Sequence, residues 1–235
     1  MNLIDLGIIA VLGIGFILGW YKGFLTTALN LASYAAAWLI SLIFYKPLAS
    51  FMLAKTNFDN TLLYLTAGAE KLSDMSVANV DVNTLGKERV TEIISTSNLP
   101  KPIENMMLDN ILNNAFASQG ISTLSDYFNQ TLINLSVSLI SFLIIFLAVR
   151  LICMFVIGLL DFVTKLPVLK QCDKVIGGAC GVLQAAVIVA IIFAVIPIAM
   201  SVLPFDNFNT MVQSSFFGKL FFNHNIIFNI LRSVL

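Results

Sequence analysis

The sequence predicts an all-α membrane protein with four transmembrane helices, a helical extramembrane insert between the second and third spans, and a C-terminal amphipathic helix. Two observations predict this class. The 235 residues are 58% hydrophobic, with a mean hydropathy of +0.92, and only 11% are charged, whereas soluble domains carry about 25% charged residues. Four apolar stretches are also long enough to cross the ~30 Å hydrocarbon core of a bilayer, which takes roughly 20 helical residues.

The first domain, residues 1–46, is predicted to be a helical hairpin with spans at 3–20 and 24–45. The short turn WYKG separates the two apolar runs. Asp5 stands near the start of the first span, where a secretory signal peptide carries Lys or Arg, and no small-residue cleavage site follows. We therefore expect this span to be retained. The Asp5 carboxylate is expected at the outer interface, where the positive end of the helix dipole favours it.

Residues 47–131 form the predicted extramembrane insert, which contains more acidic than basic residues. Apolar residues recur at helical spacing in parts of it, for example at Val90, Ile93 and Ile94, which predicts short amphipathic helices. Pro100 prevents these helices from merging into one long helix.

A second membrane domain follows at residues 132–203, with predicted spans at 132–160 and 176–203. The polar junction DFVTKLPVLKQCDKV separates the two spans. Residues 204–235 form a tail in which apolar residues recur at helical spacing among basic ones. This pattern favours an amphipathic helix that lies along the membrane surface or packs over the outer ends of the spans.

The basic residues of the short loops predict the orientation in the membrane. Lys22 lies in the first turn, and Lys165, Lys170 and Lys174 lie in the junction, so with four spans these two loops share one side. Short loops rich in Lys and Arg face the cytoplasm. The insert and both termini are therefore expected outside.

Small residues recur along three of the predicted spans. Gly15, Gly19 and Gly23 follow one another at intervals of four, and Gly177 and Gly181 do the same. A comparable face in the second span carries Ala28, Ala32 and Ala36. A dinucleotide-binding turn needs its glycines between a strand and a helix, whereas these glycines lie within apolar helical runs. We therefore predict that they let neighbouring helices approach closely and gain van der Waals contact.

Polar side chains inside the spans are candidates for function because they are costly in lipid. The candidates for a polar pathway between the helices are Asn30, Ser33, Asn134, Ser138 and Gln184. Hydrogen bonding between helices is the alternative role, and amides and hydroxyls without a buried acid favour it. Arg150 is the strong charge inside a span, and we expect its long side chain to snorkel toward the cytoplasmic boundary.

The sequence offers no recognisable catalytic or metal-binding pattern. Its only histidine is His224, and Cys153, Cys172 and Cys180 form no C-x-x-C pair, so a zinc or iron site lacks ligands. No nucleophile stands with a base, and no phosphate-binding loop is present. The 13 basic and 13 acidic residues cancel, which argues against a nucleic-acid partner. We therefore expect a protein without enzymatic activity, cofactor or metal.

Three segments of the sequence resemble one known family. They are NLIDLGIIAVLGIGFILGWYKGFLTTALNL, KLPVLKQCDKVIGGACGVLQAAVI and SSFFGKLFFNHN. Besides the spaced glycines, the motif positions in them are Asp5, Lys22, Gly23, Phe24, Pro167 and Gly178. These segments resemble the CvpA family, the colicin V production proteins of bacterial membranes. The resemblance covers the membrane part of the chain, residues 1–46 and 132–225.

The resemblance implies a multi-pass inner-membrane protein that acts in colicin V production or export and in envelope maintenance, as a non-catalytic accessory. The implied partners are the lipid bilayer and other membrane or envelope proteins, or a second copy of the chain. A small channel or transporter, with a polar pathway between its helices, is the alternative function.

Overall fold

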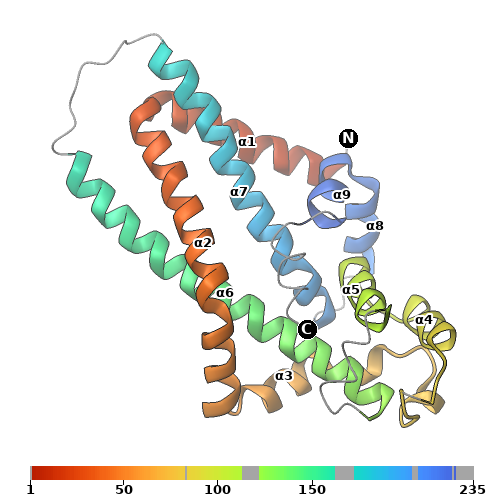
Figure 1. The fold of residues 1–235 in the computed structure, drawn as a ribbon. Coiled ribbons are helices and arrows are strands. Elements are labelled where there is room, and N and C mark those ends of the chain that lie inside the picture. The colour runs from red at the N-terminus through yellow and green to blue at the C-terminus, as the bar shows by residue number, and fades with distance from the viewer. Residues whose placement is uncertain are drawn as a thin grey trace. The chain divides into compact units, whose positions relative to one another are not determined.

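The structure is a computed structural model that describes residues 2–82, 84–112, 122–161, 172–202, 206–223 and 225. The four long helices in this part of the chain are α1 (Leu3–Lys22), α2 (Phe24–Lys55), α6 (Leu124–Asp161) and α7 (Cys172–Val202) (Figure 1). The shorter elements are α3 (Phe58–Thr66), η1 (Gly68–Lys71), η2 (Met75–Val77), α4 (Lys87–Ser95), α5 (Lys101–Leu112), α8 (Asp206–Ser214) and α9 (Phe216–Asn223). The described residues form no strand, and the pairing of Asp81 with Thr123 is an isolated bridge.

Each long helix contains a stretch that is long and apolar enough to cross a membrane. In α1, only 17% of that stretch is buried within the chain, so most of its apolar surface needs another apolar environment. The bilayer supplies such an environment. The predicted fold class, an all-α membrane protein with four transmembrane helices and a helical insert, is confirmed.

Two of these helices extend beyond the apolar runs. α2 continues past residue 46 to Lys55 and contains Pro47, and α6 begins at Leu124, before residue 132. Hydropathy indicates where a helix leaves the lipid, whereas backbone hydrogen bonding decides where the helix ends. The predicted domain boundaries at 46 and 132 therefore fall inside helices.

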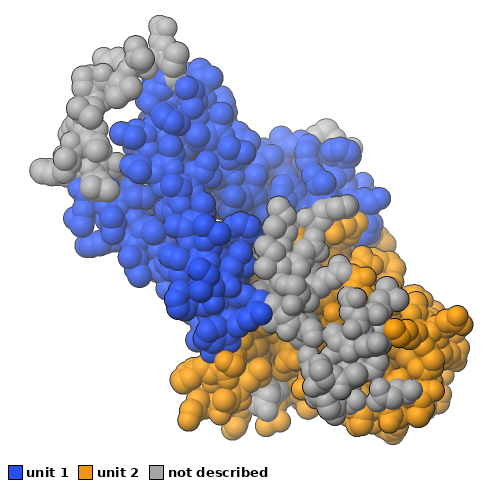
Figure 2. Space-filling view, viewed as in Figure 1, with its two compact units in different colours: residues 1–48, 140–192, 211–221 blue, residues 49–139, 193–210, 222–235 orange. Residues whose placement is uncertain are grey.

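The chain divides into two compact units, coloured blue and orange in Figure 2. Unit 1 contains residues 1–48, 140–192 and 211–221. Unit 2 contains residues 49–139, 193–210 and 222–235. Helices α2, α6 and α7 each contribute residues to both units.

Unit 2 has a hydrophobic core of its own. Val90, Ile93 and Ile94 lie buried on one face of α4, as their helical spacing predicts. They belong to a cluster that includes Ile103 of α5 and Phe128 of α6. Burying an apolar side chain of this size stabilises a fold by about 1.5–3 kcal/mol relative to leaving it exposed. The insert is therefore a folded body rather than a linker.

Hydrogen bonds also join the insert to α6. The Ala69 backbone N–H donates to the Asn129 side-chain oxygen over 2.8 Å, and the Tyr127 hydroxyl donates to the Met107 carbonyl oxygen over 3.0 Å. Because both bonds reach α6, the first half of that long helix packs against the insert and forms part of the unit 2 core.

The predicted amphipathic tail forms two short helices, α8 and α9, within the described residues. They are separated at Ser215. Phe216 and Leu220 of α9 are exposed, whereas Phe222 is buried. The tail prediction beyond residue 225 lies outside the described residues.

Candidate functional site

Glycine residues bring the backbones of α1 and α7 into contact in unit 1. A Cβ atom on Gly15 would lie 2.5 Å from the Ala185 Cβ and 2.6 Å from the Gly181 carbonyl oxygen. A Cβ atom on Gly177 would lie 2.6 Å from the Gly19 carbonyl oxygen. A larger side chain at these positions would push the two helices apart. The glycine face of α1 therefore contacts α7.

The turn between α1 and α2 depends on Gly23. Its φ of +78° lies in a region that side chains disfavour, and a Cβ there would collide with the Asp173 carboxylate. Asp173 lies in the first turn of α7, and its Oδ1 accepts a 2.8 Å hydrogen bond from the Phe24 backbone N–H. This bond satisfies an N–H group at the start of α2 that lacks a partner within its helix. The turn is thereby joined to the beginning of α7.

Asp5, near the other end of α1, joins α1 to α9. Its carboxylate is buried and accepts hydrogen bonds from the Ser215 hydroxyl over 2.7 Å and from the Phe217 backbone N–H over 3.0 Å. The Ser215 oxygen in turn accepts a bond from the Gly218 N–H over 2.8 Å, so Ser215 caps α9. We expected Asp5 at an interface beside the start of its own helix. Asp5 does lie beside the start of its own helix, where its Oδ2 accepts a hydrogen bond from the Asn2 backbone N–H over 3.2 Å. It is also buried against the N-terminus of α9, whose dipole favours a negative charge as well.

Arg150 of α6 is buried in unit 1, with 9% of its surface exposed. Its Nη1 donates to the Ser33 hydroxyl oxygen over 2.7 Å, and its Nη2 donates to the Asn30 side-chain oxygen over 3.0 Å. The guanidinium also lies over the Tyr34 ring, 4.2 Å from the ring centre. The expectation that Arg150 snorkels is therefore wrong, because polar and aromatic groups of α2 hold its charged head.

These contacts connect the three segments that carry the family resemblance. A family model described as "Colicin V production protein" matches residues 4–72 and 111–225, well over half of the chain. The chain belongs to this family. The match also covers both ends of the insert, which the resemblance seen in the sequence did not include. No curated protein and no solved structure matches the chain.

Membership of the colicin V production family, together with the four apolar helices, makes the chain a multi-pass membrane protein linked to colicin V production. The other motif positions of the family resemblance are Lys22, which lines the cavity described below, Pro167 and Gly178. Pro167 lies outside the described residues. A Cβ on Gly178 would lie 2.6 Å from the Phe16 ring, so this glycine also lies in a tight contact.

Sequence reasoning missed Asp173 as a partner of the α1–α2 turn. An acidic residue in the first turn of an apolar helix was the available signal, because such residues complement helix N-termini.

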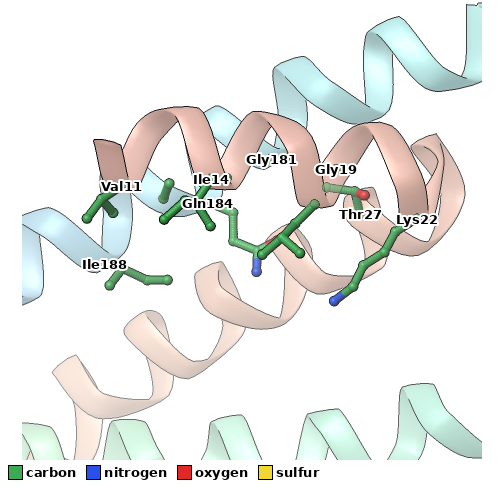
Figure 3. Close-up of a pocket in the computed structure, with 11 residues that line it drawn as sticks. Val11, Ile14, Gly19, Lys22, Thr27, Gly181, Gln184 and Ile188 are labelled. Carbon is green, nitrogen blue, oxygen red and sulfur yellow. The ribbon is translucent and has the colours of Figure 1, made fainter. Parts of the chain in front are cut away.

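This family member has a cavity of about 130 Å³ in unit 1, lined by residues of α1, α2 and α7 (Figure 3). Val11, Ile14 and Ile188 form part of its apolar lining. Figure 3 shows the Lys22 and Gln184 side chains extending toward the same space. The cavity therefore combines apolar walls with a cation and an amide.

The residues predicted for a polar pathway lie in separate surroundings. Asn30 and Ser33 bind the buried arginine, and Gln184 lines the cavity. Asn134 and Ser138 belong to unit 2, where Ser138 is buried. A pathway that connects all of them stays a prediction.

The described residues contain no group of three or more His, Cys, Asp or Glu side chains that could hold a metal ion. Cys153 and Cys180 are partly exposed free thiols. The arrangement in unit 1 is thus dominated by helix caps, glycine contacts and one buried cation.

Proposed function

We propose that this member of the colicin V production family is a non-catalytic accessory component of the bacterial inner membrane, acting in colicin V production or export and in envelope maintenance. One observation carries the proposal: the motif residues at both ends of α1 contact other helices. Asp5 holds the start of α9, and Gly23 and Phe24 contact Asp173 of α7. A carboxylate engaged with the N–H groups of a helix start is a structural group. The motif therefore supports assembly of the fold.

In this proposal α1 is the central element of unit 1, because its two ends and its glycine face each hold another helix. Packing between helices in lipid relies on van der Waals contact and hydrogen bonds rather than on the expulsion of water. Close contact of the α1 and α7 backbones supplies that attraction. The result is a closely packed helical body in the membrane.

Unit 2 offers a surface for a partner in this proposal. Tyr64 of α3 is 86% exposed, and its neighbours Leu63 and Leu65 are also exposed. α3 has nine residues and is too short to span a bilayer, and an exposed apolar patch can mark an interaction site. We infer that a membrane or envelope protein, or a second copy of the chain, binds there.

The proposed orientation places the Lys22 turn in the cytoplasm, and the insert and both termini outside. The positive-inside rule supports it. The bond from Phe24 to Asp173 supports a common side for the turn and the start of α7. Asn2 donates to the Met211 carbonyl oxygen over 2.6 Å, which supports a common side for the first and last helices, as an even number of crossings requires.

Secretion of colicin V by a strain that lacks the chain tests the accessory role. Complementation with the wild-type chain should restore secretion. A variant with Tyr64→Ser and Leu65→Ser should insert in the membrane but fail to restore it, whereas Arg89→Gln, on the exposed face of α4, should restore it fully. Full secretion with the α3 variant would exclude α3 as the partner surface, and full secretion without any chain would end the proposal.

A small channel or transporter is the second candidate, and the cavity with Lys22 and Gln184 favours it. Liposomes that contain the purified chain should leak ions or small solutes if this function is correct. Asn30→Leu and Asn134→Leu should then reduce the leak. A leak with that dependence would replace the accessory role, whereas tight liposomes would exclude the channel.

A further inference from the structure

Arg150 carries a positive charge inside the membrane-spanning part of unit 1. Both helices that contribute to its surroundings, α2 and α6, are candidate spans. Asn30 lies six residues after Phe24, the first residue of α2, which corresponds to about 9 Å along the helix. The polar headgroup layer on each side of a bilayer is only about 5–8 Å thick. A helix that begins at the outer edge of this layer would therefore hold the guanidinium below the headgroups.

The hydrogen bonds of Arg150 use only some of its N–H donors. A guanidinium has five N–H donors. The structure pairs one with Ser33 and one with Asn30, while the Nε atom is buried without a hydrogen-bond partner. An unpaired buried N–H group costs free energy, so a ligand that accepts from this edge of the guanidinium would be favoured.

The charge of Arg150 is also uncompensated. Its partners Asn30, Ser33 and Tyr34 are neutral. Among the described residues, no carboxylate forms an ion pair with Arg150. Neutral acceptors satisfy N–H groups but leave the cation costly in a medium of low dielectric constant. An anion would offset part of that cost.

We propose that Arg150, held in place by Asn30 and Ser33, binds a phosphate oxyanion inside the membrane. The planar fork of a guanidinium presents two N–H groups in the geometry of two phosphate oxygens. A cation within a span draws headgroups and water inward by local thinning of the bilayer, which brings phosphate to this depth. The phosphate comes either from the headgroup of an anionic phospholipid or from free inorganic phosphate. This site uses none of the motif residues on which the proposed function rests.

Binding to the purified full-length chain in micelles of a neutral detergent tests the proposal. One comparison is between phosphatidylglycerol and phosphatidylcholine, and the other is between inorganic phosphate and chloride at equal ionic strength. In both, the shift of the unfolding temperature of the chain reports the affinity. We expect Arg150→Gln to weaken the binding of the active anion by about tenfold or more, since it loses charge-assisted hydrogen bonds. Arg89→Gln is the matched control and should bind like the wild type, because Arg89 is exposed and paired with Glu92.

The two arms identify the source of the phosphate. Stabilisation by phosphatidylglycerol alone assigns a lipid headgroup, and stabilisation by inorganic phosphate assigns the free ion. Equal binding of both anions by wild type and Arg150→Gln would overturn the proposal, as would the absence of any stabilisation of the wild type.

A second measurement uses the wild-type residue at position 150, so it does not depend on whether an Arg150 variant folds. The wild-type chain with ¹⁵N-labelled arginine side chains is placed in bilayers containing phosphatidylglycerol, or in neutral bilayers with inorganic phosphate. Solid-state NMR then detects the dipolar coupling between ³¹P and the guanidinium ¹⁵N nuclei. The arginines of the sequence are Arg89, Arg150 and Arg232, so samples of Arg89→Gln and Arg232→Gln assign the remaining signal to Arg150. Coupling at that signal is the expected result, and its absence under both conditions would overturn the proposal.

Discussion

Replacing Gly19 by Ala tests whether backbone contact holds α1 and α7 together. A Cβ at this position would fall on the Gly177 carbonyl group and lie 3.0 Å from the Gly181 Cα. These are backbone atoms, which cannot rotate away as a side chain can, so the helices must separate. Overpacking of this kind costs about 1–3 kcal/mol, and the better helix propensity of Ala returns at most about 1 kcal/mol. Because the clash is with backbone atoms, we place its cost near the upper end of that range, and we expect a net loss of about 2 kcal/mol in the free energy of unfolding, and a larger loss for Gly19→Leu.

Gly13→Ala is the matched control in the same helix, because no described atom outside the helix lies within 4 Å of a Cβ built there. Reversible unfolding in mixed micelles with increasing dodecyl sulfate measures the free energy of both variants. Gly13→Ala should equal or slightly exceed the wild type in stability. Both variants should still insert, since Ala keeps the span apolar. Equal stability of the two variants would refute the contact between the α1 and α7 backbones.

Three further predictions concern the ends of α1 and the orientation. Asp5→Asn removes the charge that caps α1 and holds α9 and should cost about 1–2 kcal/mol; faster hydrogen exchange in α9 and at the start of α1 is expected, and unchanged exchange would contradict the capping role. Gly23→Ala forces a side chain into a positive φ and should cost about 1–2 kcal/mol, whereas Gly7→Ala, which meets open space, should be neutral; equal losses would count against a strained turn. In intact cells an impermeant thiol reagent should miss Cys172 and label a Ser95→Cys variant, and the reverse labelling would invert the proposed orientation.

The spans and the glycine spacing were predictable from the sequence because both are local patterns. A membrane selects apolar runs of a given length, and a four-residue interval places glycines on one helix face. The partner helix was not predictable in the same way. Gly15 and Gly19 could have packed on the small residues of α2 or of α7, and a pattern within one helix does not report which distant helix it meets.

The contacts of the candidate site were not predictable from the sequence for the same reason. Arg150 contacts Ser33 across 117 residues of sequence, and Asp5 contacts Ser215 across 210. Snorkelling is the general behaviour of an arginine near a helix end, and here it was the wrong expectation. Asn30, Ser33 and Tyr34 stand at helical spacing on one face of α2, and that local pattern was the available signal for a buried cation opposite it.

The late synthesis of the partners of α1 affects how the fold is reached. Asp173 follows Phe24 by 149 residues, and Ser215 follows Asp5 by 210. At about 5–20 residues per second, the ribosome completes these partners roughly 10–40 s after α1. During that interval α1 lies in the bilayer without these partners. Other helices that carry small residues can bind the glycine face of α1 in that time. We therefore expect the rate of translation to affect how much of the chain forms the correct contacts between α1 and its partners. The insertion machinery that holds α1 during this interval should have the same kind of effect.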